Sequence, residues 1–343
     1  MNPKKWNIAI LGATGAVGAE MLSILEERDF PLHHLHLYAS GESEGLSLKF
    51  RNKSIRIKQL TEEIINDFKS IDIALLSMGN ELSRYYTPLI TQKGTVCVDN
   101  SAAWRMDPAI PLIVPEVNYS DIERFRKRKI IANPNCSTIQ MVRVLKPIHD
   151  VFRVKRVVVS TYQSTSGQGK DGMEELACQT IALLNGKKIE PKAFPHQIAF
   201  NCIPHIDRFS ENGYTLEEMK MIDETKKILN DTTIRITATC VRVPVFSAHA
   251  ESVNIETEQP LTASAVRHLL SEQKGIKVVD EPHKNGYPLN VDAAGRDEVF
   301  VGRIRQDESV AHGINLWIVS DNLRKGAALN AIQIAEALIS EFL

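Results

Sequence analysis

Short apolar runs alternate with helical repeats in the first third of the chain. Residues Asn7–Leu11 form one such run, and Ala16 to Glu27 then carry apolar side chains at helical spacing. Further strand-like runs lie at Leu35–Ala39, Ile71–Ser77 and Thr95–Asp99, and Leu82–Gln92 has helical spacing. Strands that alternate with helices in this way predict a parallel sheet with helices on both faces.

The pattern changes near Ile130–Asn135, where Pro134 interrupts the chain before a possible helix at Ser137–Leu145. Long stretches rich in β-branched residues follow at Val154–Tyr162, Thr233–Val245, Ser252–Thr257 and Val310–Val319. These stretches predict a second sheet of mixed or antiparallel type. The last segment, Asn322–Phe342, predicts a single amphipathic helix.

Together these elements predict an α/β protein of two domains, which is also what 343 residues favour. We expect a Rossmann-like, parallel-sheet dinucleotide domain over residues 1–133 and an α+β catalytic domain with a mixed sheet over 134–321. The final helix, 322–343, is expected to return to the first domain.

The charge balance limits the class of partner. The 41 basic and 42 acidic side chains give a net charge of −1, which provides no general attraction to nucleic acid or to an anionic membrane. No run approaches 18 apolar residues, so no transmembrane helix is expected, and we predict a cytoplasmic protein. An anionic substrate would have to be bound by a few specific cations.

Five cysteines are present, at positions 97, 136, 178, 202 and 240, without any CxxC pair. The odd number and the spacing argue against a disulfide framework and against a zinc site, and no metal is predicted. For every cysteine except Cys136 we expect a buried, structural role.

The turn after the first strand carries glycines at GxxGxxG spacing, which differs from the common GxGxxG fingerprint. Glycine is required where the backbone turns sharply and approaches a pyrophosphate, and the helix N-terminus then supplies free N–H groups. A plain glycine-rich turn is the alternative, but the position after the first strand favours cofactor binding. The candidate cofactor residues are Gly12, Thr14, Gly15, Ala16, Val17 and Gly18.

The end of the second strand bears on the choice of coenzyme. NAD enzymes usually have an acidic residue here, but this strand ends in Ala39-Ser40, which leaves room for a 2′-phosphate beside Ser40 and Ser43. No arginine follows, and Glu42 lies where a phosphate would favour a cation. The residues alone therefore do not decide whether the coenzyme is NADP or NAD.

Cys136 is the candidate nucleophile. It precedes an apolar helix within Asn133–Thr138, and a helix N-terminus stabilises a thiolate. The polar neighbours Asn135 and Ser137 count against an inert, buried cysteine. A cysteine nucleophile beside a nicotinamide indicates aldehyde or acyl chemistry through a thioester.

Such chemistry requires a base and cations, and several residues are candidates. Gln163 ends a strand before a run of small polar residues, and Arg242 and His249 flank Pro244. His249 lies in a stretch of small residues, where an imidazole can be exposed to a cleft. Arg105 follows a strand end, and Glu217 and Lys220 pair at i, i+3 on a charged helix, a spacing that is usually found on solvated surfaces.

Seven segments, in order along the whole chain, resemble the aspartate-semialdehyde dehydrogenase family. They are Gly12–Gly18 (GATGAVG), Asp99–Asn118, Asn133–Gln140 (NPNCSTIQ), Thr161–Gly169 (TYQSTSGQG), Glu217–Lys220 (EEMK), Cys240–Val253 (CVRVPVFSAHAESV) and Asp321–Glu336. The resemblance implies reduction of L-aspartyl-4-phosphate to L-aspartate-4-semialdehyde with release of phosphate, on the route to lysine, threonine and methionine.

The resemblance also implies roles for individual residues. Cys136 falls on the acyl-forming nucleophile, His249 on the acid/base, Gln163 on the residue that orients the acyl group, and Arg242 on the arginine that binds the substrate carboxylate. Arg105 and Lys220 fall on the phosphate-binding cations, and Glu217 on the acid of the Glu–Lys pair. Thr14 to Val17, Ser166, Gly167 and Asn322 fall on cofactor contacts. The family implies NADP and a homodimer or dimer of dimers.

One departure from the family pattern concerns the coenzyme, because Glu42 stands where the family commonly has an arginine.

Two other functions remain open. One is another phosphorylating semialdehyde dehydrogenase, of the N-acetyl-glutamyl-phosphate reductase type. The other is a non-catalytic redox sensor that only binds the dinucleotide, and for which Cys136 would be inert. Arg242, with the paired Arg105 and Lys220, favours an aspartyl substrate.

Overall fold

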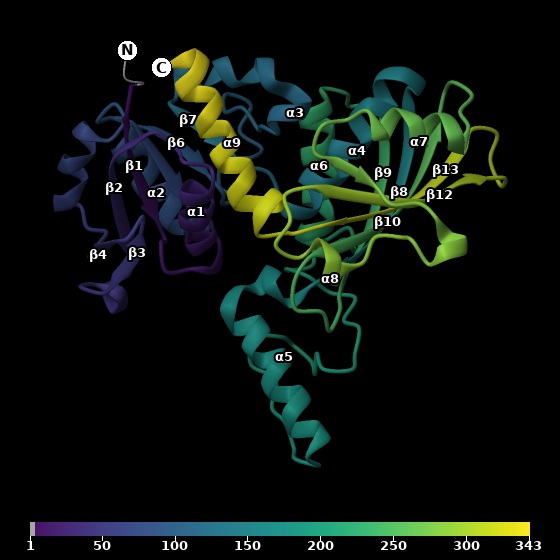
Figure 1. Cartoon of the computed structure of the whole chain (residues 1–343), viewed down its shortest axis with the longest axis horizontal. Coiled ribbons are helices and arrows are strands. Elements are labelled where there is room, and N and C mark those ends of the chain that lie inside the picture. Colours follow the sequence, from purple (N-terminus) through teal and green to yellow (C-terminus); the bar gives the residue numbers. More distant parts are fainter. Residues whose placement is uncertain (1–3) are drawn as a thin grey trace. The chain divides into compact units, whose positions relative to one another are not determined.

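A computed structural model describes residues 4–343 of the chain, which divide into two compact units. The first unit comprises the described part of Met1–Asn135 together with Ala327–Leu343, and the second comprises Cys136–Gly326. The predicted boundaries were 133/134 and 321/322. Figure 1 shows the elements of both units.

The first unit is built on a seven-stranded sheet of order β3-β4-β2-β1-β5-β6-β7, and every ladder except β3–β4 is parallel. Its strands are β1 (Trp6–Leu11), β2 (Leu32–Ala39), β3 (Ser47–Phe50), β4 (Lys53–Gln59), β5 (Ile73–Leu76), β6 (Val96–Asp99) and β7 (Ile130–Ala132). Its α-helices are α1 (Ala16–Glu27), α2 (Asn80–Thr91), α3 (Pro115–Asn118) and α9 (Leu329–Ala337). The predicted Rossmann-like parallel sheet is confirmed.

Strand β1 shows how the sheet is covered on both faces. Ile8 and Ile10 pack into a core with side chains of α1 and α9, whereas Ala9 and Leu11 pack into another with Tyr38 and side chains of α2. Successive side chains on a strand point to opposite faces, so the apolar residues Ile8–Leu11 are buried on both sides of the sheet. The C-terminal helix α9 therefore completes one face of the parallel sheet.

The second unit contains a six-stranded sheet of order β11-β12-β13-β10-β8-β9. Its strands are β8 (Val154–Gln163), β9 (Arg235–Arg242), β10 (His249–Thr257), β11 (Ile276–Val278), β12 (Val299–Asp307) and β13 (Gly313–Ser320). Ladders β8–β9 and β11–β12 are parallel and the others antiparallel, which confirms the predicted mixed sheet.

Helices of the second unit position the strand ends that carry polar residues. They are α4 (Cys136–Phe152), α5 (Gly169–Leu184), α6 (Leu216–Leu229), α7 (Ala263–Ser271) and α8 (Asn290–Ala293). Helices α4, α6 and α7 pack on one face of the sheet around Val157, Val253 and their neighbours. Helix α6 begins with a capping box between Thr215 and Glu218, which fixes its first turn.

Several elements differ from their predicted bounds; β2, for example, begins at Leu32 instead of Leu35. Helix α4 continues past Leu145 to Phe152, and β10 begins at His249 instead of Ser252. The C-terminal segment opens with a π-helical turn, Arg324–Ala328, before α9. That segment is buried around most of its circumference, so its apolar residues do not form a single stripe. Among residues 4–343, none of the helices has the length and apolar character of a membrane span.

Candidate active site

The glycine loop of the first unit has the geometry of a dinucleotide cradle. Gly12 has φ +82°, and a Cβ there would lie 2.1 Å from the carbonyl oxygen of Ser77. A Cβ on Gly18 would lie 2.2 Å from the carbonyl oxygen of Gly12, so this glycine allows α1 to approach β1. A Cβ on Gly15 would come no nearer than 3.4 Å to its surroundings. The fold thus requires Gly12 and Gly18, whereas Gly15 leaves space where a pyrophosphate would approach.

The loop after β2 lies beside the glycine loop, because the Ser43 hydroxyl donates to Thr14 Oγ1 over 3.3 Å. Glu42 is exposed in the short 3₁₀ turn Gly41–Ser43, as expected of a solvated loop. Sequence reasoning missed a cation here, since Nη2 of Arg56 lies 3.6 Å from the position of a Cβ on Gly45. Arg56 reaches this loop from β4, the neighbour of β2 in the sheet, which its position in the sequence does not indicate.

Arg105 is buried in the loop that follows β6, and its Nη2 donates to the carbonyl oxygen of Asn100 over 2.8 Å. Asp99, at the end of the strand, accepts hydrogen bonds from the Ser83 hydroxyl and from the Ser101 N–H. Burial raises the pKa of the Asp99 carboxyl. Asn133 Nδ2 donates to Asn100 Oδ1 over 2.6 Å and ties the same loop to the end of β7. This network orients the Arg105 loop at the carboxyl edge of the parallel sheet.

Cys136 is the first residue of α4, as predicted, and is partly exposed. A helix N-terminus stabilises the thiolate form of a cysteine. Gly326 allows the C-terminal segment to pass close by, since a Cβ there would lie 2.9 Å from Cys136 Cβ. Any larger residue at position 326 would displace the cysteine or the chain beside it.

A hydrogen-bonded series connects the helix start to a charged pair. Gln163 Nε2, at the end of β8, donates to Ser137 Oγ and, over 3.2 Å, to Glu217 Oε1. Lys220 Nζ contacts Glu217 Oε2 at 3.1 Å and Asp207 Oδ2 at 2.8 Å. The Glu217–Lys220 pair is therefore not the solvated surface pair that its spacing suggested, since Glu217 is buried.

His249 is fully buried, so its imidazole is not exposed as the small residues around it would have allowed. Its Nδ1 accepts a hydrogen bond from the Ser164 N–H at 3.1 Å and lies 3.0 Å from the Ser164 hydroxyl. Burial, followed by the charge of Arg242, lowers the pKa of His249 to about 3. The ring is therefore neutral at pH 7, with its proton on Nε2.

Arg242 ends β9, directly across the ladder from Gln163. It is buried, and its Nη1 donates to the carbonyl oxygen of Ser164 over 2.6 Å. Burial lowers the pKa of Arg242, while attraction from Glu217 and Cys136 opposes that shift. The guanidinium and the imidazole meet at Gly167, where a Cβ would lie 2.7 Å from Arg242 Nη1 and 3.3 Å from His249 Nε2.

Ser166, Gly167 and Asn322, the expected cofactor contacts of the second unit, lie together. Asn322 Oδ1 accepts from the hydroxyls of Ser164, at 3.1 Å, and Ser166, at 2.9 Å. It also accepts from the Ala248 N–H at 3.1 Å. Because its oxygen is already engaged, Asn322 would have to reach a ligand through Nδ2.

Glu251 was not singled out from the sequence. It lies two residues after His249 on β10, is fully buried, and neither carboxyl oxygen has a hydrogen-bond partner among residues 4–343. Burial raises its pKa well above the usual range, and the nearby Gln140 offsets only part of that shift. Burial therefore favours the protonated form of this carboxyl.

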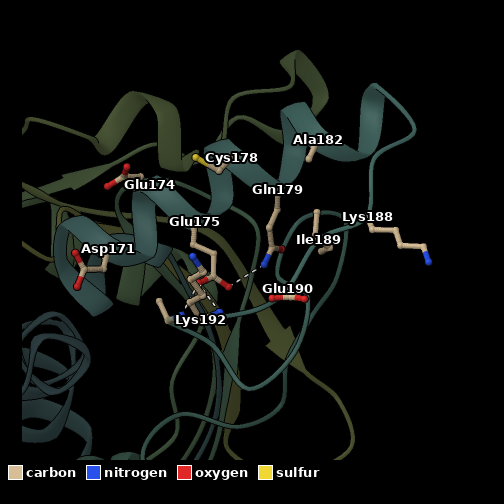
Figure 2. Close-up of a pocket in the computed structure, with 11 residues that line it drawn as sticks. Asp171, Glu174, Glu175, Cys178, Gln179, Ala182, Lys188, Ile189, Glu190 and Lys192 are labelled. Atoms are coloured by element: carbon tan, nitrogen blue, oxygen red, sulfur yellow. Dashed lines mark hydrogen bonds between the residues drawn. The ribbon is translucent and has the colours of Figure 1, made fainter.

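Neither the remaining cysteines nor the cavity beside α5 belongs to the site described above. Cys97 and Cys240 are buried as expected, but Cys178 and Cys202 are exposed, so the expected structural role was wrong for those two. A cavity of about 780 Å³ lies between α5 and the segment that follows it, and Figure 2 shows the residues that line it. It is lined by Glu175, Cys178, Lys192 and their neighbours, and by none of the predicted site residues.

Comparison with known proteins defines the class. Residues 7–125 match the family model of the semialdehyde dehydrogenase NAD-binding domain, and residues 145–325 match that of the semialdehyde dehydrogenase dimerisation domain. The protein is therefore a two-domain semialdehyde dehydrogenase.

The relatives narrow the assignment. The chain is 54% identical over 338 residues to an aspartate-semialdehyde dehydrogenase of Aquifex aeolicus, with 98% of each chain covered. It is 51% identical to aspartate semialdehyde dehydrogenase II of Vibrio cholerae, whose crystal structure is complexed with ASA. That match has a TM-score of 0.96 and covers 99% of this chain and 100% of the other. The NADP-containing enzyme of Candida albicans matches at 25% identity with a TM-score of 0.76, covering 98% of each chain. The chain belongs to the aspartate-semialdehyde dehydrogenase family.

Proposed function

We propose that this enzyme reduces L-aspartyl-4-phosphate to L-aspartate-4-semialdehyde through a thioester on Cys136. The Cys136 thiolate attacks the acyl carbon, the bond from that carbon to the phosphate oxygen breaks, and phosphate leaves. The acyl carbon is then reduced by a hydride, which a nicotinamide coenzyme would supply when held at Gly12–Gly18. The carbon–sulfur bond then breaks, which releases the aldehyde and restores the thiolate.

One observation carries this proposal. Cys136 begins α4 within the second unit, and the side chains of Gln163, Arg242 and His249 come from the adjoining ends of β8, β9 and β10. Electrostatic attraction between Arg242 and Cys136 supports the placement of a cation beside the nucleophile. A non-catalytic sensor has no need of this arrangement.

The other side chains take roles that follow from their charge and contacts. Arg242 offers a planar guanidinium for the substrate α-carboxylate, and Gln163 orients the acyl oxygen. His249 holds and moves the proton at that oxygen through Nε2. Lys220 and Arg105 bind the phosphate, and Glu217 orients Lys220 over 3.1 Å. Gly12–Gly18, Ser40 and Ser43 would hold an NADP-type coenzyme, and Glu42 would weaken its preference over NAD. Ser166, Gly167 and Asn322 are proposed as further coenzyme contacts.

We further propose a homodimer or dimer of dimers in the cytoplasm. Large apolar side chains are exposed on the second unit, whose family model is a dimerisation domain: Ile181, Leu184, Phe200 and Val291 are 64%, 75%, 65% and 80% exposed. Exposed apolar groups of this kind favour burial against another copy.

The test is a phosphate-dependent assay with L-aspartate-4-semialdehyde. We expect NADP reduction that requires phosphate and is lost in Cys136→Ser. An equal rate with N-acetyl-glutamate semialdehyde would support the other reductase type instead, and binding of the coenzyme without turnover would support the sensor.

A further inference from the structure

The residue that precedes His249 has an unusual backbone. Ala248 has φ +67°, in the left-handed region that L residues with a Cβ rarely adopt. Ten other non-glycine residues between positions 4 and 343 have positive φ, and none of them is buried, whereas Ala248 is fully buried. A strained residue in this position persists only where its surroundings impose it.

Two asparagines impose the conformation. The Ala248 N–H donates to Asn322 Oδ1 over 3.1 Å, and the Ala248 carbonyl oxygen accepts from Asn290 Nδ2 over 2.8 Å. That carbonyl belongs to the peptide group that joins Ala248 to His249. Asn290 begins the short helix α8 and therefore orients the peptide plane from which the His249 backbone continues.

The same asparagine that binds the Ala248 N–H also organises the contact on the His249 ring. Asn322 Oδ1 accepts from the Ser164 hydroxyl, and the Ser164 N–H donates to His249 Nδ1. The Asn322 side-chain oxygen thus helps to fix both the backbone before His249 and the contact on its ring.

There is little space for the ring to move. Gly167 packs so closely that a Cβ there would lie 3.3 Å from His249 Nε2. A rotation of the peptide group before His249 would move Nε2 relative to Cys136 and Arg242. Even a small displacement of a reacting group lowers turnover strongly.

We propose that Ala248, held in the left-handed conformation by Asn290 and Asn322, is a positioning residue that sets the orientation of His249 Nε2. The inference rests on the proposed function of His249. Asn290 is the informative position to change, because its side chain contacts the Ala248 carbonyl and is not part of the proposed catalytic or binding groups.

The test is a double-mutant cycle on Asn290 and Ala248. Asn290→Ala removes the donor, and we expect kcat to fall about tenfold while the KM for phosphate changes less than about twofold. Ala248→Gly alone keeps kcat within about twofold, because glycine adopts positive φ without strain. In the double variant, with Ala248→Gly and Asn290→Ala together, we expect kcat to be at least about threefold higher than in Asn290→Ala alone.

A merely structural role gives a different pattern. In that case Asn290→Ala lowers the melting temperature but leaves kcat per folded enzyme unchanged, or its effect is the same in the glycine background. Either result overturns the proposal. If Asn290→Ala does not fold, Asn290→Ser gives the same comparison, because its hydroxyl is too short to reach the carbonyl. Failure of the proposed function is distinguishable, since the unmodified enzyme would then show no phosphate-dependent turnover.

Discussion

The backbone N–H of Ser164 donates a hydrogen bond to Nδ1 of His249 over 3.1 Å. A ring nitrogen that accepts from an amide carries no proton, so the neutral ring has its proton on Nε2, on the side that faces Gly167. If Nδ1 were protonated, its hydrogen would point at the hydrogen of the Ser164 N–H, and the two would repel each other. The hydrogen bond and the burial of the ring thus act in the same direction and keep the resting imidazole neutral.

We predict that His249 stays neutral well below pH 6.5 in the folded enzyme. Its pKa is lowered to about 3, mainly by burial and then by Arg242. The unfolded chain therefore binds a proton near pH 6.5 that the native state does not bind, so this group reduces stability as pH falls from 6.5 towards 3. Histidine-ring NMR, with the His249→Asn variant to assign the signal, should show no titration between pH 8 and 5. A midpoint near 6.5 would contradict the assignment.

The cations should act on different substrates. Arg242→Lys should raise the KM for the semialdehyde about tenfold or more, because an ammonium group cannot form the bidentate pair with a carboxylate. Lys220→Ala should raise the KM for phosphate instead. Lys226→Ala, on the same helix α6, is the matched control and should change neither constant. Steady-state kinetics with each substrate varied in turn checks this, and equal effects of Arg242→Lys and Lys220→Ala on both constants would refute the division of roles.

The coenzyme preference should depend on Glu42. A charge pair 4 Å apart is worth about 1 kcal/mol in water, which corresponds to roughly five- to tenfold in affinity. Glu42→Arg removes a repulsion and adds an attraction, so it should raise the ratio of kcat/KM for NADP to that for NAD by at least this factor, and the gain should shrink in high salt. Glu44→Arg, two residues along the same exposed loop, is the comparison. An unchanged ratio in Glu42→Arg, or an equal gain in both variants, would mean that Glu42 does not face the ribose.

Glu251 and Glu256, both on β10, should have opposite effects on stability. Burial raises the pKa of Glu251 in the folded state, so its contribution is fully present below the unfolded pKa of about 4.5 and is lost as pH rises towards the higher folded value. Lys155 lowers the pKa of Glu256, so that contribution is present above the unfolded pKa and is lost in acid. Glu251→Gln should melt a few degrees higher than the unmodified enzyme at pH 8 and at the same temperature near pH 4. Glu256→Gln should melt no higher at pH 8, and a lower melting temperature for Glu251→Gln at pH 8 would show that the carboxylate is ionised and paired.

Local patterns were sufficient to predict much of the first unit. The apolar run before Gly12 and the helical spacing after it predicted β1 and α1, because each lies within one short segment. Helix α5 was missed, since it begins at a glycine and leaves Ile181 and Leu184 exposed, which weakens the contrast between its faces. Nothing in the periodicity indicated that β10 begins at His249.

The candidate site was predictable where a residue type carries its own chemistry. Cys136 could be identified from a polar turn before an apolar helix. Three other residues could not be identified in this way. Ala248 is notable for its backbone angle, and Asn290 for a hydrogen bond to a residue 42 positions away. Glu251 is notable because it is completely buried. Arg56 was missed for a similar reason, since only the order of strands in the sheet brings it beside Gly45.

The thioester on Cys136 is tested most directly by trapping it. The enzyme is mixed with L-aspartate-4-semialdehyde and NADP in the absence of phosphate, quenched in acid and digested for mass spectrometry. We predict one aspartyl group on the peptide that contains Cys136, discharged when phosphate is added before the quench, and none in Cys136→Ser. Turnover without a modified Cys136 peptide, or near-normal turnover of Cys136→Ser, would contradict the account.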